Sequence, residues 1–274
     1  MRALRFVALA LTLSPAAFSP AAFAQDWART ALEASPRHGE WVALDAAGGR
    51  TLHAFVVYPE SKTKAPVVLV IHEIFGLSEW AMSMADQLAA AGCIAIAPDL
   101  LSGDGPDKGR TKDFPNTTAA REAVGKLAPE RVTADLDLAA DYAVKLPASN
   151  GKLVVAGFCW GGAQTFRYAN HKATLAGAFV FYGTGPTTAE GVATIACPVY
   201  GFYAENDARV NATLEGSAAA MKAAGKTFEP VTYAGGGHGF MRAGDDPAGT
   251  EANKAARAKA WERLNALLKP HLTE

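Results

Sequence analysis

Short runs of consecutive hydrophobic residues recur along this chain, and they are the first guide to its structure. Residues 67–71 read Val-Val-Leu-Val-Ile, with no polar position between them. Apolar runs of this length are typical of strands that are buried on both faces of a parallel sheet. On the same grounds we predict strands at residues 93–100, 152–156, 177–183, 198–207 and 228–235.

Between these runs, hydrophobic residues recur at helical spacing. Trp80, Met84 and Leu88 fall one helical turn apart, which predicts a helix over residues 78–91. Ser78 can cap its first turn. Further helices are predicted at residues 117–127, 130–146, 163–168, 213–225 and 249–269, and a hairpin is predicted at residues 41–59, where apolar runs flank a Gly-Gly turn.

The order of these elements predicts the fold class. Strands alternate with helices, and most strands are apolar throughout, so we expect an α/β protein with a mostly parallel sheet covered by helices on both faces. The polar segment 102–129 is expected to run over one end of the sheet. We predict a single domain over residues 25–274, with no large cap domain.

Composition narrows the class of partner. The chain has 274 residues and a formal net charge of −1 at pH 7. A nucleic-acid-binding protein normally carries a basic excess, so no nucleic-acid partner is expected. A small molecule is the predicted partner, and the chain is expected to be a monomer or a small homo-oligomer.

The first 24 residues have the order of a secretory signal peptide. Arg2 and Arg5 are followed by an apolar stretch and then by small residues that end in Ala22-Phe23-Ala24. The apolar stretch is broken at Pro15 and is too short to span a membrane. We therefore expect cleavage after residue 24 and an exported protein, periplasmic or secreted, without a membrane anchor. A buried N-terminal helix is the alternative.

Export makes the cysteines informative. The chain has three, Cys93, Cys159 and Cys197, and an odd number in an exported protein suggests a free thiol. Cys93 and Cys197 open predicted strands and are expected in the core. A disulfide between these two is the alternative, and it requires a narrow Cα–Cα distance.

Cys159 lies in an unusual setting. It is flanked by Gly157 and Gly161 where a predicted strand passes into a predicted helix. This is the strand–nucleophile–helix elbow Gly-x-Ser-x-Gly, with sulfur in place of oxygen. Glycine is needed there because side chains would collide with the adjoining backbone, and the helix N-terminus favours a thiolate. The spacing therefore predicts a nucleophile.

A nucleophile of this kind needs a base and a group that orients the base. Asp207 and His238 follow two later predicted strands, and the order nucleophile, acid, histidine is that of this architecture. Each has a plainer interpretation, since Asp207 can cap the helix that follows it and His238 can be a solvated loop residue. Three roles in order at three strand ends favour the catalytic interpretation.

These segments resemble the dienelactone hydrolase family. The resemblance rests on His72-Glu73-Ile74-Phe75-Gly76, Pro98-Asp99-Leu100, Gly157-Phe158-Cys159-Trp160-Gly161-Gly162, Glu205-Asn206-Asp207 and Gly237-His238-Gly239-Phe240, and it covers about residues 40–270. It implies an α/β-hydrolase fold, no cofactor or metal, and hydrolysis of an enol-lactone or similar ester. It also implies a triad of Cys159, His238 and Asp207, a proton-accepting carboxylate at Glu73, and an oxyanion hole formed by the amides of Ile74 and Trp160.

The resemblance also bears on substrate binding. It places Phe75, Trp160 and Arg242 at the substrate, with Arg242 as one of two arginines that hold a substrate carboxylate. Plainer interpretations are a solvated Arg242 and an ion pair between Glu73 and an arginine. The second arginine should follow Leu100, but the first arginine after that point is Arg110. The sequence therefore does not predict dienelactone itself as the substrate.

The predicted function is hydrolysis of a carboxylic ester or lactone through Cys159. Two other classes remain open. A thiol-based redox enzyme would also use Cys159, although the sequence has no Cys-x-x-Cys pair. An exported hydrolase-like binding protein would keep the elbow without turnover.

Overall fold

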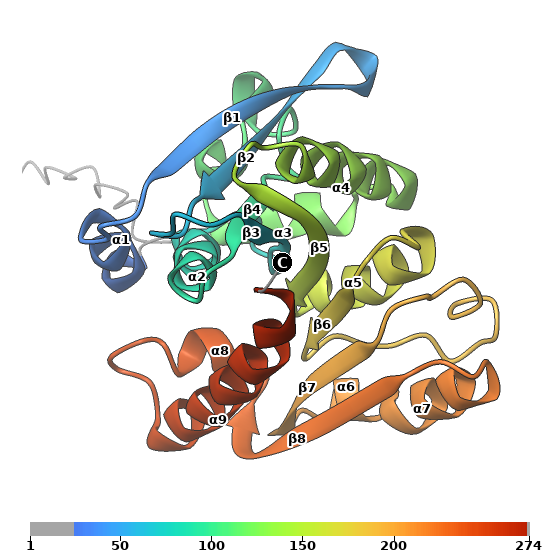
Figure 1. Ribbon diagram of the computed structural model, residues 1–274. Coiled ribbons are helices and arrows are strands. Elements are labelled where there is room, and N and C mark those ends of the chain that lie inside the picture. Colours follow the sequence, from blue (N-terminus) through green and yellow to red (C-terminus); the bar gives the residue numbers. More distant parts are fainter. Residues whose placement is uncertain (1–24, 273–274) are drawn as a thin grey trace, which may run out of the picture.

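The computed structural model describes residues 25–272, which are built around one eight-stranded sheet with the order β1-β2-β4-β3-β5-β6-β7-β8 (Figure 1). Residues 1–24, and with them the predicted signal peptide, lie outside the described residues. The strands are β1 (Gly39–Ala46), β2 (Arg50–Val57), β3 (Ala65–Ile71), β4 (Ile94–Pro98), β5 (Ser149–Phe158), β6 (Gly177–Phe181), β7 (Val199–Asn206) and β8 (Phe228–Gly237).

The sheet is mostly parallel, as the apolar runs predicted. Strands β3 to β8 pair with one another in parallel. The hairpin predicted at residues 41–59 is also present, because β1 and β2 pair in antiparallel and β2 joins the sheet beside β4. The carboxyl ends of the parallel strands therefore meet at one edge, where functional groups of such sheets collect.

Helices cover both faces (Figure 1). The core on one face includes residues of α4, α5 and α7, and the core on the other includes residues of α1, α2 and α9. The helices are α1 (Asp26–Glu33), α2 (Glu79–Ala90), α3 (Thr117–Gly125), α4 (Pro129–Val144), α5 (Trp160–His171), α6 (Ala208–Asn211), α7 (Leu214–Ala223), α8 (Phe240–Ala243) and α9 (Glu251–Leu268). The sequence did not predict α1, α6 or α8; the last two have only four residues each, too few to show a helical period.

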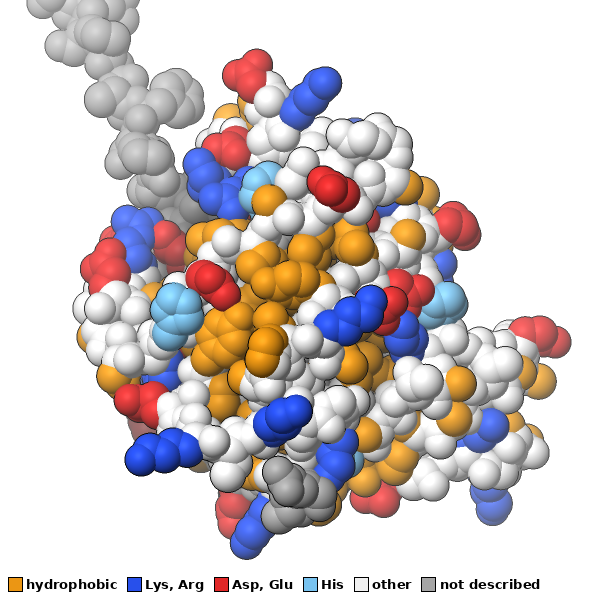
Figure 2. Space-filling model, turned by 45° about the horizontal axis from the view of Figure 1, so that its top comes forward, with side chains coloured by type: hydrophobic (Ala, Val, Ile, Leu, Met, Phe, Trp, Pro, Cys, Tyr) orange, Lys and Arg blue, Asp and Glu red, His pale blue; other side chains and the backbone are white. Residues whose placement is uncertain are grey.

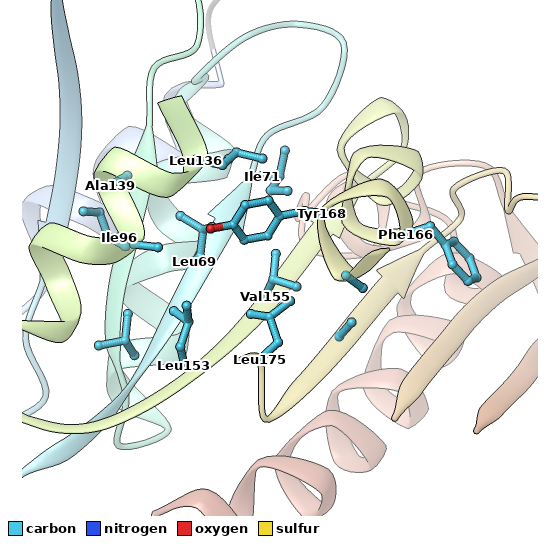
Figure 3. Packing of buried hydrophobic residues seen from close by; sticks show 14 of the residues in the cluster. Leu69, Ile71, Ile96, Leu136, Ala139, Leu153, Val155, Phe166, Tyr168 and Leu175 are labelled. Carbon is cyan, nitrogen blue, oxygen red and sulfur yellow. The ribbon is translucent and has the colours of Figure 1, made fainter. Parts of the chain in front are cut away.

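Strand β3 shows why its sequence has no polar position. Leu69 and Ile71 point into the core beneath α4 and α5, whereas Val68 and Val70 point into the core beneath α2. Successive side chains of a strand face opposite sides, so a strand covered twice must be apolar at every position. Figure 3 shows Leu69 and Ile71 packed with residues of α4 and α5, among them Leu136 and Tyr168.

The cysteines that open two of the strands are not paired. Cys93 and Cys197 are both buried and free. They precede β4 and β7, which are separated in the sheet by β3, β5 and β6. Neighbouring strands lie roughly 4.8 Å apart, so these positions are much too distant for a disulfide. The prediction of core residues is confirmed, and the alternative of a disulfide is wrong.

The segment between β4 and α4 makes the longest excursion from the sheet. It carries only α3 and short 3₁₀ turns, so no cap domain is inserted among residues 25–272.

Figure 2 shows a face on which hydrophobic side chains gather in the middle, with acidic and basic side chains around them. Within the described part of the chain, no helix is both long and apolar enough to cross a membrane.

Candidate active site

Cys159 lies at the sharp turn between β5 and α5. Its backbone has φ 56° and ψ −114°, a conformation that side-chain-bearing residues rarely adopt. The turn is held by the Cys159 amide, which donates a hydrogen bond of 3.0 Å to the Phe181 carbonyl at the end of the neighbouring strand β6. Strain of this kind persists where surrounding structure enforces it, and it is often found at functional sites.

The two flanking glycines are required by close backbone approach. A Cβ atom at Gly157 would come within 2.2 Å of the Gly161 carbonyl oxygen. A Cβ atom at Gly161 would come within 2.3 Å of the Ile71 carbonyl oxygen, at the end of β3. The Gly-x-Cys-x-Gly spacing thus lets α5 begin directly against two strand ends.

The structure brings the three residues of the predicted triad together. His238 Nε2 lies 3.1 Å from the Cys159 sulfur, and His238 Nδ1 lies 2.5 Å from Asp207 Oδ2. Asp207 is buried, whereas about a third of the His238 side chain, 34%, is exposed. The imidazole therefore joins a sheltered carboxylate to a sulfur atom that faces a solvent-accessible pocket.

These contacts also set the charge of the imidazole. The hydrogen bond to Cys159 is the main reason that the pKa of His238 is raised to about 9; burial opposes the rise, and the hydrogen bond to Asp207 adds to it. A protonated imidazole is stabilised between a sulfur acceptor and a carboxylate acceptor. The arrangement can thus hold a proton on His238, between the sulfur atom and the carboxylate.

Glu73 follows β3 and pairs with Arg242, from helix α8. Its Oε2 accepts a hydrogen bond of 2.7 Å from Arg242 Nε, and the Glu73 side chain is 4% exposed. Burial is the largest single effect on the pKa of Arg242 and acts to lower it, but the charge of Glu73 and its hydrogen bond together contribute more, and the pKa is raised. The ion pair that the sequence left open for Glu73 is therefore present, at the edge of the pocket that holds Cys159.

Ile74, which follows β3, and Trp160, which directly follows Cys159, both line the pocket around Cys159. Trp160 is the first residue of α5, so its amide has no partner within the helix. Neither this amide nor that of Ile74 donates a hydrogen bond to another residue between Gln25 and Leu272. Both remain available to a substrate oxygen, and their role as an oxyanion hole stays a prediction.

His72, directly before Glu73, is a packed residue. It is fully buried, and its ring stacks on that of Trp160 with centroids 5.6 Å apart. Burial lowers the pKa of His72 to about 4, so the ring is neutral. His72 therefore supports the segment that carries Glu73 and Ile74, and it contributes no charge to the site.

The site opens into a cavity of about 610 Å³. All the site residues predicted from the sequence line it. Phe75 forms part of the wall, with the Arg242 guanidinium 5.4 Å from its ring centroid. The lining residues are Glu73, Ile74, Phe75, Arg121, Cys159, Trp160, Ala163, Thr184, Asp207, Arg209, His238 and Arg242.

Sequence reasoning missed several residues of this site. Tyr182 follows β6, has a positive φ of 38°, and packs edge-on against the His238 ring at 5.3 Å. Burial, the main cause, raises the pKa of Tyr182 well above its usual range. Arg121, Thr184 and Arg209 line the cavity. Arg209 and Tyr182 directly follow strand regions, a signal that could have found them, but Arg121 lies far from any strand end in the sequence.

Arg110, the first arginine after Leu100, does not reach this cavity. Its guanidinium stacks 3.8 Å above the ring of Trp41, which lies in β1 and is 40% exposed.

The described part of the chain also contains no group of three or more His, Cys, Asp or Glu residues arranged to hold a metal ion.

A profile of the dienelactone hydrolase family matches residues 52–272. The chain belongs to this family. It is 32% identical over 227 residues to a Salmonella typhi protein named "Putative carboxymethylenebutenolidase", covering 79% of this chain and 82% of the relative. It is 34% identical over 150 residues to the carboxymethylenebutenolidase of Pseudomonas putida, covering 53% and 61% of the two chains.

A solved structure agrees with this assignment. The crystal structure of a "Putative Dienelactone Hydrolase" from Klebsiella pneumoniae is similar with a TM-score of 0.72 and 27% sequence identity, covering 85% of this chain and 98% of that chain. The chain is therefore a dienelactone hydrolase-like hydrolase with an α/β-hydrolase fold. The predicted family and the predicted fold class are both confirmed.

Proposed function

We propose that this hydrolase cleaves a carboxylic ester or lactone through a thioester on Cys159. The relative from Pseudomonas putida is named for a lactone substrate. The observation that carries the proposal is the position of His238 Nε2, 3.1 Å from the Cys159 sulfur, with Asp207 on the other ring nitrogen. This is the arrangement of a nucleophile, a general base and the group that orients the base.

The reaction proceeds in two halves. The Cys159 thiolate attacks the carbonyl carbon, and the carbonyl oxygen becomes negative next to the amides of Ile74 and Trp160. The C–O bond of the ester breaks, and the leaving alkoxide takes the proton from His238. Neutral His238 then removes a proton from water, the hydroxide attacks the thioester, and the carboxylic acid leaves as thiolate and imidazolium re-form.

Glu73 is the second candidate for the proton of Cys159. A thiol that ionises only when substrate arrives is less exposed to oxidation than a permanent thiolate. In the described structure Glu73 Oε2 is bound to Arg242 Nε at 2.7 Å. Transfer to this oxygen therefore requires the ion pair to open, which a substrate that attracts Arg242 would achieve.

Substitution of the nucleophile tests the proposal. Cys159→Ala should lower the hydrolysis of p-nitrophenyl esters and simple lactones by more than about 10³-fold. Cys197→Ala, which changes a buried thiol outside the cavity, is the matched control and should retain activity. Mass spectrometry of a rapidly quenched reaction should show an acyl group on Cys159. Full esterase activity in Cys159→Ala would refute the scheme, and peroxide turnover with a thiol reductant in place of ester turnover would favour a redox enzyme.

We also infer that residues 1–24 direct export and are removed. The inference rests on the basic, apolar and small-residue order of that segment. Fractionation of the expressing bacterium, with the mass of the recovered protein, tests it. A mass that starts at residue 25 is expected outside the cytoplasm, and an intact chain retained in the cytoplasm would contradict the inference.

A further inference from the structure

Two arginines of the active-site cavity have no partner in the protein. Arg121 and Arg209 are exposed, and neither makes an ion pair, a side-chain hydrogen bond or a ring contact with any residue between Gln25 and Leu272. Every other arginine in that range has such a partner, namely Arg29, Arg37, Arg50, Arg110, Arg131, Arg167, Arg242, Arg257 and Arg263. The unpartnered guanidinium groups are therefore concentrated at one place, the cavity around Cys159.

The charges of the cavity are not balanced. Its two carboxylates are already committed, Glu73 to Arg242 and Asp207 to His238. No other acidic side chain lines it, so Arg121 and Arg209 leave the cavity with an uncompensated positive charge. A concave site with charge of one sign attracts ligands of the opposite sign.

The two arginines come from different sides of the nucleophile. Arg121 is on α3, in the segment that follows β4, and Arg209 is on α6, directly after β7 (Figure 1). In the sheet, β5 and its elbow lie between β4 and β7. A substrate that lies across Cys159 would therefore approach one arginine with its acyl part and the other with its alcohol part.

We propose that Arg121 and Arg209 are specificity-determining residues that select esters carrying a carboxylate or another oxyanion away from the scissile bond. The inference rests on the proposed function. The planar guanidinium group binds an oxyanion through two hydrogen bonds. Arg242 is held by Glu73, and Arg110 is stacked on Trp41 outside the cavity. Arg121 on α3 and Arg209 on α6 can thus bind an anion without opening an ion pair, while Phe75 and Trp160 line the apolar part of the cavity.

Matched pairs of substrates test this proposal. On the alcohol side, 4-acetoxybenzoate is compared with its neutral methyl ester; on the acyl side, mono-p-nitrophenyl adipate is compared with p-nitrophenyl hexanoate. The double variant Arg121→Gln/Arg209→Gln should lower kcat/KM for the anionic member of at least one pair by tenfold or more, mainly through KM, and change the neutral members less than about twofold. The single variants assign the effect to each side. Arg167→Gln on α5, outside the cavity lining, is the control and should leave both ratios unchanged.

The outcomes separate this proposal from the proposed function. The ratio of kcat/KM for the anionic substrate to kcat/KM for the neutral substrate is compared in the double variant and the wild type. If both ratios stay within about twofold of the wild type while Cys159-dependent hydrolysis continues, the assignment of Arg121 and Arg209 is wrong and the proposed function stands. If no ester is hydrolysed at all, the proposed function fails. In that case the anion site is tested by calorimetric binding of adipic acid monoanilide, which is not an ester. A Kd that is tenfold higher in the double variant than in the wild type supports the anion site, and an equal Kd in the two proteins overturns it.

Discussion

Asp99 and Asp207 each follow a parallel strand, and both are buried, but they have different surroundings. Asp99, after β4, accepts hydrogen bonds from the Leu101 amide at 3.2 Å, the Thr111 amide at 3.0 Å and the Thr111 hydroxyl at 2.6 Å. Asp207, after β7, accepts from His238 at 2.5 Å and from the Val210 amide at 3.4 Å. A strand-end position therefore does not by itself make a carboxylate catalytic; the group that it faces decides.

Asp99 still serves the site at a distance. Its partner Thr111 also accepts a hydrogen bond of 3.0 Å from the Leu77 amide, in the segment that carries Ile74 and Phe75. Burial raises the pKa of Asp99 to about 6, against the effect of its three donors. Asp99 thus connects the segment after β4 to the segment after β3, whereas Asp207 orients a reacting group.

The largest expected effect is that of Asp207→Asn. The amide can favour the wrong tautomer of His238, so kcat should fall by about 10⁴-fold while the fold is retained. Esterase kinetics, with thermal unfolding as the control for folding, measure this. Retention of more than a tenth of the wild-type rate would remove the distinction between the two aspartates.

Asp99→Ala should act on stability instead. It leaves three buried donors without their acceptor, and we expect a loss of about 3 kcal/mol in the free energy of unfolding. The folded fraction should keep kcat within about tenfold of the wild type, since Asp99 does not line the cavity. Urea denaturation and esterase kinetics on one preparation measure both. A variant of normal stability but without activity would contradict this role.

Thr111→Val tests the connection through Asp99 with a smaller change. The variant keeps the shape of the side chain but leaves the Leu77 amide without its acceptor, so the free energy of unfolding should fall by about 1–2 kcal/mol. Thr111→Ser, which keeps the hydroxyl, is the matched control and should lose less. Equal losses in the two variants would mean that packing, and not the hydrogen bond, holds the two segments together.

The smallest expected effect is a pH dependence of stability that comes from His238 and its partners Cys159 and Asp207. The pKa of His238 is raised from about 6.5 to about 9, so its contribution to stability is complete below pH 6.5 and is lost as the pH rises through 9. After allowance for screening of this partly exposed group, the loss should be about 1 kcal/mol. Denaturation of the wild type at pH 6 and pH 9.5, compared with His238→Gln, measures it. A pH dependence of the free energy of unfolding that remains in His238→Gln but disappears in Asp99→Asn would contradict this prediction, because the titrating group would then be Asp99.

Much of the fold could be predicted because burial on both faces leaves a direct mark on the sequence. The strands and long helices lie within a few residues of the predicted ranges, as β3 and α2 show. Helix α2 even begins at its predicted cap, since Ser78 accepts a hydrogen bond from the Ala81 amide. The short helices α6 and α8 leave no such mark.

The chain order of Cys159, Asp207 and His238, with glycines around the cysteine, was enough to name the elbow and its partners, because only certain residue types fit a strained turn beside a helix N-terminus. The ion pair of Glu73 with Arg242 and the places of Arg121 and Arg209 in the cavity depended on how distant segments meet. Local patterns record backbone strain and burial within a few residues. Which charges face each other across a cavity is set by the packing of elements that are far apart in the sequence, and only the tertiary structure decides it.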